Sequence, residues 1–111
     1  MSRHSAGSGG PAPLFAALGD ETRLALVDRL GASGPQSIAR LTAGSGVTRQ
    51  AITKHLHVLA DVGLVHDVRR GREHIWELDT QRLDEARRYL DQISRHWGEA
   101  LERLRKFVED E

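Results

Sequence analysis

The chain has 111 residues, of which 39% are hydrophobic and 29% are charged. This composition is typical of one soluble globular domain, and no apolar run approaches the roughly 20 residues that span a bilayer. The sequence contains no cysteine, which excludes disulfides, thiolate metal sites and thiol redox sensing and favours a cytoplasmic location. The 16 basic residues balance the 16 acidic ones, so any nucleic-acid-binding surface must be local.

The N-terminal segment is rich in Gly, Ser and Pro and has no apolar core. We therefore predict a disordered tail over residues 1–13 and a single domain over residues 14–111. A short apolar cluster that begins at Leu14 predicts a first helix. Asp20 stands where a helix N-cap is expected, and the apolar spacing after it predicts a second helix that ends at Gly31.

The next segment has the pattern of two helices joined by a flexible turn. Ser37 can cap a third, short helix, which gives way to the Gly- and Ser-containing residues 43–46. Thr48 can cap a fourth helix over residues 49–62, because good helix formers continue without Gly or Pro until Gly63. This arrangement predicts a helix-turn-helix unit.

A last helix is predicted from Asp79 or Thr80 to near the C-terminus. Its apolar residues alternate steps of three and four, and such a seam requires a partner helix. The seam consists of Leu83, Ala86, Leu90, Ile93, Trp97, Ala100, Leu104 and Phe107. The predicted fold is mainly α with a small β-hairpin, a winged helix-turn-helix with a long C-terminal dimerisation helix.

The fourth helix has one apolar arc and one polar face. At about 100° per residue the arc contains Ile52 and Leu56, and the polar face lies opposite. Gln can bond adenine, Arg can bond guanine, and Lys can neutralise phosphate, so the polar face suits base readout in a major groove. The alternative is an ordinary solvated helix face. The candidate DNA-binding residues are Thr48, Arg49, Gln50, Thr53, Lys54 and His57.

Short apolar runs flank the segment Arg69-Arg70-Gly71-Arg72 and predict a β-hairpin with a basic tip. A tip this cationic suits the DNA backbone or a narrow minor groove, so Arg69, Arg70 and Arg72 are further candidate DNA-binding residues. The alternative is a solubilising turn, in which Arg69 could pair with Glu73 across the hairpin.

Several segments in this order resemble the ArsR-type family of bacterial winged-helix repressors over about residues 14–108. They are Ala17-Leu18-Gly19-Asp20-Glu21-Thr22-Arg23, the run from Val47 to Leu56, Gly63-Leu64-Val65 and Arg70-Gly71-Arg72. The resemblance implies a homodimer that binds a palindromic operator and is released by an inducer, here an unknown small molecule. It also implies an interface between the first and last helices, formed by Leu14, Phe15, Leu18, Leu83, Ala86, Leu90, Ile93, Trp97, Leu101 and Leu104.

Many members of this family sense metal ions, and this chain departs from their patterns. The thiolate site needs paired cysteines, and the sequence has none. The site on the last helix needs two earlier ligands at Leu83 and Glu85, and leucine cannot bind a metal. His96 and Glu99 match only the later half of that site, as candidate ligands that water or another subunit would have to complete. We predict no metal and no cofactor, with His96 as a surface residue beside the seam.

The sequence offers no catalytic constellation. It has no Gly-rich phosphate loop, no Gly-x-Ser-x-Gly elbow and no His-Glu-x-x-His motif, so we predict that the protein is not an enzyme. Two functions remain open. The first is a sequence-specific repressor of double-stranded DNA without membrane association, and the second is a winged-helix interaction module or anti-repressor that does not bind DNA.

Overall fold

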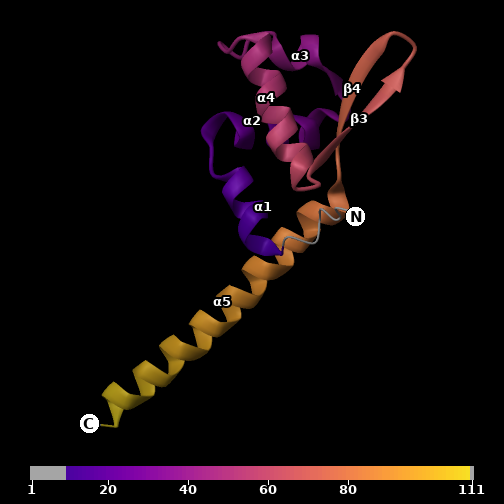
Figure 1. The fold of residues 1–111 in the computed structure, drawn as a ribbon. Helices are drawn as coiled ribbons and strands as arrows, with labels where there is room; N and C mark the ends of the chain where they lie inside the picture. The colour runs from indigo at the N-terminus through magenta and orange to yellow at the C-terminus, as the bar shows by residue number, and fades with distance from the viewer. Residues whose placement is uncertain (1–9, 111) are drawn as a thin grey trace.

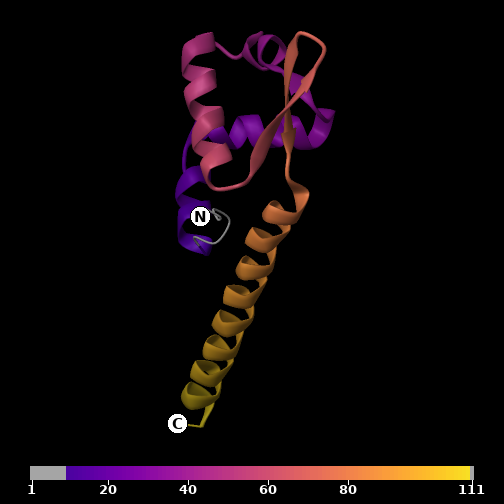
Figure 2. The same cartoon turned by 45° about the vertical axis from the view of Figure 1, so that its right-hand side comes forward.

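The computed structural model describes residues 10–110, and its elements follow the predicted order (Figure 1). They are α1 (Pro11–Leu18), α2 (Glu21–Ser33), β2 (Gln36–Ser37), α3 (Ile38–Thr42), α4 (Arg49–Asp61), β3 (Val65–Arg70), β4 (Glu73–Leu78) and α5 (Thr80–Glu109). The elements before α5 form a head, and α5 projects away from it (Figure 2). The described part therefore extends over 69 × 36 × 20 Å. Within it, no helix combines the length and the apolar character that a membrane crossing requires.

Most of the helices begin at a side chain that satisfies the first turn. A side-chain oxygen of the N-cap accepts a hydrogen bond from the backbone N–H three residues later, a donor that would otherwise lack a partner. This confirms the predicted starts of α2, α3, α4 and α5 at the N-cap residues Asp20, Ser37, Thr48 and Asp79.

Two predicted boundaries are wrong. Helix α1 begins at Pro11, so the predicted tail over residues 1–13 is too long, and residues 1–9 lie outside the described part. Proline suits the first turn because its fixed φ is helical and its missing N–H is not needed there. Helix α2 continues past Gly31 and ends before Gly34, whose φ of 78° favours glycine. A glycine inside a helix costs only about 1 kcal/mol relative to alanine, which packing can override.

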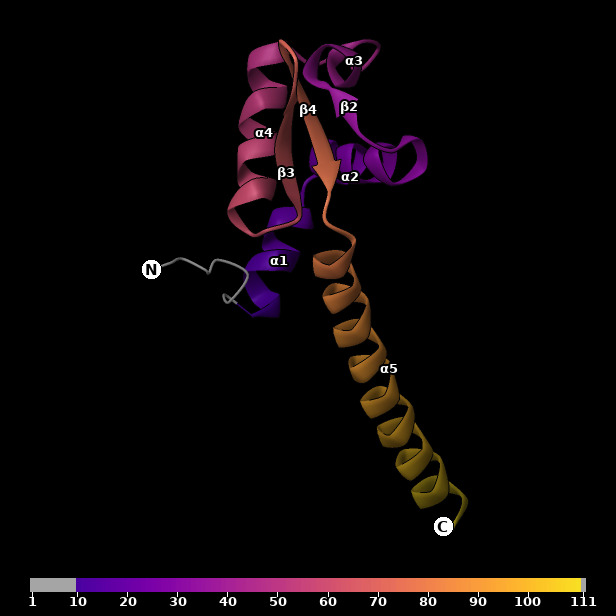
Figure 3. The ribbon, with the colours of Figure 1, turned by 90° about the vertical axis from the view of Figure 1, so that its right-hand side faces the viewer.

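The predicted hairpin is confirmed as strands β3 and β4, and the short strand β2 pairs with the outer side of β4 (Figure 3). Sequence reasoning missed β2 because two residues are too few to show a periodic pattern. Gly71 begins the turn with a φ of 62°. The register places Arg70 opposite Glu73 and Arg69 opposite His74, so the expected pairing of Arg69 with Glu73 is wrong. Arg69 Nη2 instead lies 2.7 Å from His74 Nε2.

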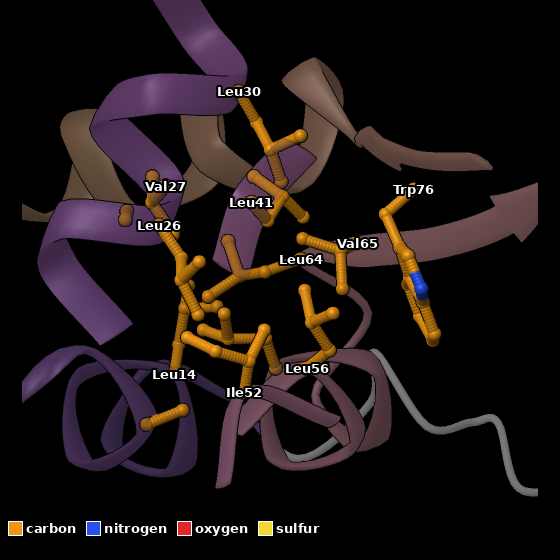
Figure 4. Packing of buried hydrophobic residues seen from close by; sticks show 13 residues of the cluster. Leu14, Leu26, Val27, Leu30, Leu41, Ile52, Leu56, Leu64, Val65 and Trp76 are labelled. Atoms are coloured by element: carbon orange, nitrogen blue, oxygen red, sulfur yellow. The ribbon is translucent and has the colours of Figure 1, made fainter. Parts of the chain in front are cut away.

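The core lies between the inner face of α4, the helices α1 to α3 and the sheet (Figure 4). The predicted apolar arc of α4 is confirmed, since Ile52, Leu56 and Leu59 are fully buried. Helix α4 is thus held by one face, and its opposite face points to solvent. The other buried apolar residues are Leu14, Ala17, Leu26, Val27, Leu30, Leu41, Leu64, Val65, Trp76 and Ala86.

A small polar cluster joins the start of α2 to the middle of α4. The backbone N–H of Arg23 donates to Asp20 Oδ2 at 3.0 Å, and Arg23 Nη1 donates to His55 Nδ1 at 3.1 Å. The Arg23 backbone hydrogen bond lowers the pKa of Asp20 below its ordinary value of 3.8; burial opposes this shift, and the nearby charges of Arg23 and His55 lower the pKa further. The ionised form of Asp20 is therefore favoured in the folded state.

This pKa shift makes the stability of the chain depend on pH. Because the folded-state pKa of Asp20 is lowered, its charge stabilises the fold at neutral pH, and this contribution disappears as the pH falls through that lowered value. Asp20→Asn keeps an amide that can cap the helix but removes the charge. We expect the Tm of the wild type to exceed that of Asp20→Asn at pH 7, and the difference to shrink below about pH 4.

The measurement is thermal unfolding by circular dichroism at one protein concentration across this pH range. Asp28→Asn removes an exposed carboxylate from the same helix without touching the cap, so it serves as the control. A difference in Tm between the wild type and Asp20→Asn that is equally large at pH 7 and at about pH 3 would contradict this assignment.

Candidate nucleic-acid interface

The outward face of α4 presents a group of polar side chains near the start of the helix. Arg49, Gln50, Lys54 and His57 are all exposed. Within residues 10–110, no hydrogen bond or ion pair engages the side chains of Arg49, Gln50 or Lys54. These groups can therefore donate to a ligand without first breaking a contact inside the protomer.

The two threonines among the predicted DNA-binding residues are already engaged with the helix itself. Thr48 Oγ1 accepts a hydrogen bond from the backbone N–H of Ala51 at 3.1 Å, as the N-cap of α4. Thr53 is half-buried, and its hydroxyl donates to the carbonyl of Arg49 at 2.9 Å. The Thr48 hydroxyl thus caps α4 and can still donate its own O–H, whereas the Thr53 hydroxyl has used its O–H and can only accept; both threonines also offer a methyl group to a base.

His57 lies at the other end of this face and packs against the sheet. Its ring centroid is 6.0 Å from that of Trp76, with the two rings tilted by 59°. Trp76 is buried, and within the described part of the chain its indole Nε1 has no hydrogen-bond partner. His57 therefore contributes to the contact between α4 and β4, in addition to the polar surface that the sequence predicts for it.

The wing, which we define as β3, β4 and their turn, carries three exposed arginines, Arg69, Arg70 and Arg72. Arg69 contacts the imidazole of His74, as described above. Lower on the wing, His66 Nε2 lies 2.9 Å from Glu77 Oε1. No salt bridge within residues 10–110 neutralises Arg70 or Arg72.

The start of α4 and the tip of the wing lie at the same end of the head, opposite α5, in all three views (Figures 1 to 3). Folding therefore brings Arg49, Arg70 and Arg72 to one end of the molecule. By contrast, two arginines of α5 are neutralised locally, since Arg87 pairs with two aspartates and Arg105 with two glutamates of the same helix. The chain has no net charge, but Arg49, Arg70 and Arg72, which no salt bridge within residues 10–110 neutralises, come together at the end that includes the start of α4 and the wing tip.

The predicted dimer-interface residues fall into three groups. Leu90, Trp97, Leu101 and Leu104 are more than half exposed on α5. The half-buried residues are Phe15, Leu18, Leu83 and Ile93. Leu14 and Ala86 are 1% and 4% exposed, so assigning them to a contact surface is wrong: they pack into the core of their own protomer.

Sequence reasoning missed Tyr89 as a contact residue of α5. Its ring centroid lies 5.8 Å from that of Phe15, so it helps to hold α1 against α5. The available signal was its position three residues after Ala86, which places both residues on one side of the helix.

The candidate metal ligands His96 and Glu99 are both exposed on α5. Within residues 10–110, the structure brings together no group of three or more His, Asp or Glu side chains that could hold a metal ion. A site at His96 and Glu99 would therefore need ligands from outside this part of the protomer.

Comparison with known proteins shows which family of proteins the chain resembles. A family model described as a helix-turn-helix domain matches residues 18–68. The chain is 36% identical over 101 residues to the HTH-type transcriptional regulator Rv2034 of Mycobacterium tuberculosis, and the alignment covers 91% of each protein. It is 38% identical to an ArsR-like transcriptional regulator from Rhodococcus sp. RHA1, with a TM-score of 0.75 over 86% of this chain and 90% of that one.

A third relative is described as a homodimer. The homodimeric winged helix-turn-helix DNA-binding domain of Mb0332 from Mycobacterium bovis is 25% identical, with a TM-score of 0.63 over 86% of this chain and 87% of that chain. The relatives from Mycobacterium tuberculosis and Rhodococcus are named as transcriptional regulators, and their likeness extends over nearly the whole chain. The chain belongs to the ArsR-type family of winged helix-turn-helix transcriptional regulators, and it is a DNA-binding regulator rather than an enzyme.

Proposed function

We propose that the chain acts in the cytoplasm as a homodimeric repressor that binds a palindromic operator in double-stranded DNA. The observation that carries this proposal is the gathering of exposed, unpaired donors at the end of the head that includes the start of α4 and the wing tip. Helix α4 would enter the major groove by its first turns, and Arg70 and Arg72 of the wing would contact the adjacent backbone or minor groove. In this role α4 is the recognition helix.

The apolar face of α5 supports the dimer. Trp97 is 63% exposed and Leu101 60%, and a stripe of this kind on one helix is stabilised when a second helix covers it. The predicted seam continues to Phe107, well beyond the part of α5 that α1 contacts through Tyr89. A second copy of α5 has the same spacing of apolar residues and can cover this face. The homodimeric relative from Mycobacterium bovis supports the same assembly.

A dimer of this kind accounts for repression by simple occupancy. Two recognition helices related by a two-fold axis can enter successive major grooves on one side of a duplex, about 34–36 Å apart. A protein that fills both grooves at a promoter excludes RNA polymerase from the same DNA.

The decisive experiment is selection of DNA by the purified full-length protein from a library of random duplexes. We expect enrichment of a sequence with two-fold symmetry and a fixed distance between its half-sites. Retention of duplexes without any preferred sequence would overturn the operator proposal, and no retention at physiological salt would favour the interaction module instead.

Gln50 is expected to read a base. Its side chain is exposed near the start of the recognition helix, where a bidentate contact to adenine is geometrically suited. We expect Gln50→Ala to weaken binding to the selected operator by about 1–3 kcal/mol and to relax the base preference at one position of each half-site. Repeating the selection with this variant measures both effects, and Gln81→Ala on α5 is the matched control. An unchanged base preference would remove Gln50 from the readout.

The arginines of the wing are expected to contact phosphates. We expect the variant Arg70→Ala/Arg72→Ala to weaken binding to all duplexes alike and to flatten the dependence of affinity on salt. The log–log slope should fall by about 0.9 for each phosphate that the variant dimer no longer neutralises. Titrations at several salt concentrations measure this slope. Arg87→Ala/Arg88→Ala removes the same charge from α5 and should keep the wild-type slope. Equal slopes for the wild type and the wing variant would exclude the wing contact.

The apolar face of α5 is expected to hold the dimer. We expect Leu101→Glu/Leu104→Glu to give a monomer by light scattering, because a carboxylate buried in the seam has no partner. Without the second half-site, operator binding should then weaken by about a hundredfold or more. Arg95→Glu changes the charge on the opposite side of α5 and should remain dimeric. A dimeric Leu101→Glu/Leu104→Glu variant would show that α5 is not the interface.

A further inference from the structure

Arg82 is the one buried charged residue among residues 10–110, with 7% of its surface exposed. It lies in the first turn of α5, where this helix leaves the head. Neither the contact of α4 and the wing with DNA nor the apolar face of α5 uses it. A guanidinium in such a position is costly unless its N–H groups are bonded, so its partners indicate what it holds in place.

The guanidinium of Arg82 connects three parts of the chain. Its Nε donates to the carbonyl of Val62, the C-cap of the recognition helix, at 2.7 Å. Its Nη1 donates to Glu85 Oε1 of α5 at 2.6 Å, and its Nη2 donates to the carbonyl of Gly10 before α1 at 3.4 Å. The stem of Arg82 passes Gly63, where an added Cβ would lie 3.7 Å from the Arg82 Cγ atom.

The contact with Val62 is the informative one. The last carbonyls of a helix have no partner inside the helix and carry a partial negative charge, so a cation is favourable there. Arg82 supplies this cation to the recognition helix from α5. The backbone adds one further link nearby, since the N–H of Asp79 donates to the carbonyl of Leu64 at 2.8 Å.

We propose that Arg82 is a positioning residue that fixes the recognition helix relative to α5, and through it the distance between half-sites that the dimer accepts. This rests on the proposed dimeric repressor, because the orientation of α5 in each protomer then sets the separation of the two recognition helices. A buried ion pair adds little stability relative to apolar packing, whereas directed bonds from one planar group, here to Val62 at the end of α4 and to Gly10 before α1, constrain an orientation.

The first test measures the orientation without DNA. The chain has no cysteine, so Asp61→Cys on α4 and Arg95→Cys on α5 give two unique sites for spin labels. The labelled chain is mixed with excess unlabelled chain, and the distance distribution within one protomer is measured by double electron–electron resonance. We expect a narrow distribution with Arg82 and a broader one with Arg82→Met. Arg88→Met, which removes an exposed arginine from the same helix, should leave the distribution narrow.

The second test uses the operator selected above with its half-sites moved apart or together by one and two base pairs. We expect the affinity of the wild type and of Arg88→Met to fall about tenfold for each change, since every base pair also rotates one half-site around the duplex. Arg82→Met should bind the best operator about tenfold more weakly and discriminate less between spacings, while its affinity for random duplex stays unchanged. If Arg82→Met does not fold, Arg82→Lys replaces it in both tests, because a lysine ammonium cannot form the planar set of hydrogen bonds that a guanidinium makes.

A folded Arg82 variant with the wild-type distance distribution and spacing profile would overturn the proposal. So would a folded variant that is monomeric, since Arg82 would then act in the dimer contact itself. If the wild type selects no operator, the proposed function fails, but the distance measurement still decides whether Arg82 orients the recognition helix.

Discussion

The structure depends on the burial of one face of α4. Ile52, Leu56 and Leu59 have no exposed surface, and burying such side chains stabilises the head by about 1.5–3 kcal/mol each. The same packing fixes the rotation of α4 about its axis, so Gln50 and Lys54 must face solvent. Rotating the helix to point these residues elsewhere would expose the apolar arc. The core thus presents the polar face in one orientation before any ligand arrives, which lowers the entropic cost of binding.

The second feature is the separation of two unlike surfaces. The end of the head that includes the start of α4 and the wing tip presents unneutralised cations, whereas the exposed apolar residues of α5 lie on the helix that projects away from the opposite end. A chain without net charge can therefore still present cations to DNA at one end. Acidic residues of α5 pair with arginines of the same helix, as Asp84 does with Arg87, and these pairs lie far from the wing. The field that a phosphate backbone meets is therefore set by the local cations.

Much of the fold could be predicted from the sequence, because its strongest signals are local. Caps such as Asp20 and Thr48 bond within their own helix, and the period of the apolar residues shows which face of α4 is buried. The misses involve contacts between distant segments. Leu14 and Ala86 belong to apolar patterns that suit a dimer seam, yet the protomer itself buries both in its core. Only tertiary packing distinguishes these two outcomes. The sequence shows the residue types on the polar face of α4. It does not show that the hydroxyl of Thr53 is bonded within the helix.

Arg82 shows this limit most clearly. In the sequence it is one of many arginines on a charged helix, where i,i+3 pairing with a carboxylate such as Glu85 is an ordinary surface feature. Its burial follows from a tertiary fact, that the end of α4 and the start of α5 meet, and the carbonyl of Val62 has no sequence signature. Two half-sites on DNA are a fixed distance apart. A dimeric regulator of this kind therefore needs the polar face of α4 and the apolar face of α5 to keep a fixed orientation relative to each other. The apolar core holds α4, and the apolar face of α5 offers the dimer contact. The end of α4 and the start of α5 meet at the hydrogen bond from Arg82 to Val62, so this directed bond adds to the packing of Ala86 in the core in setting how the two helices are oriented.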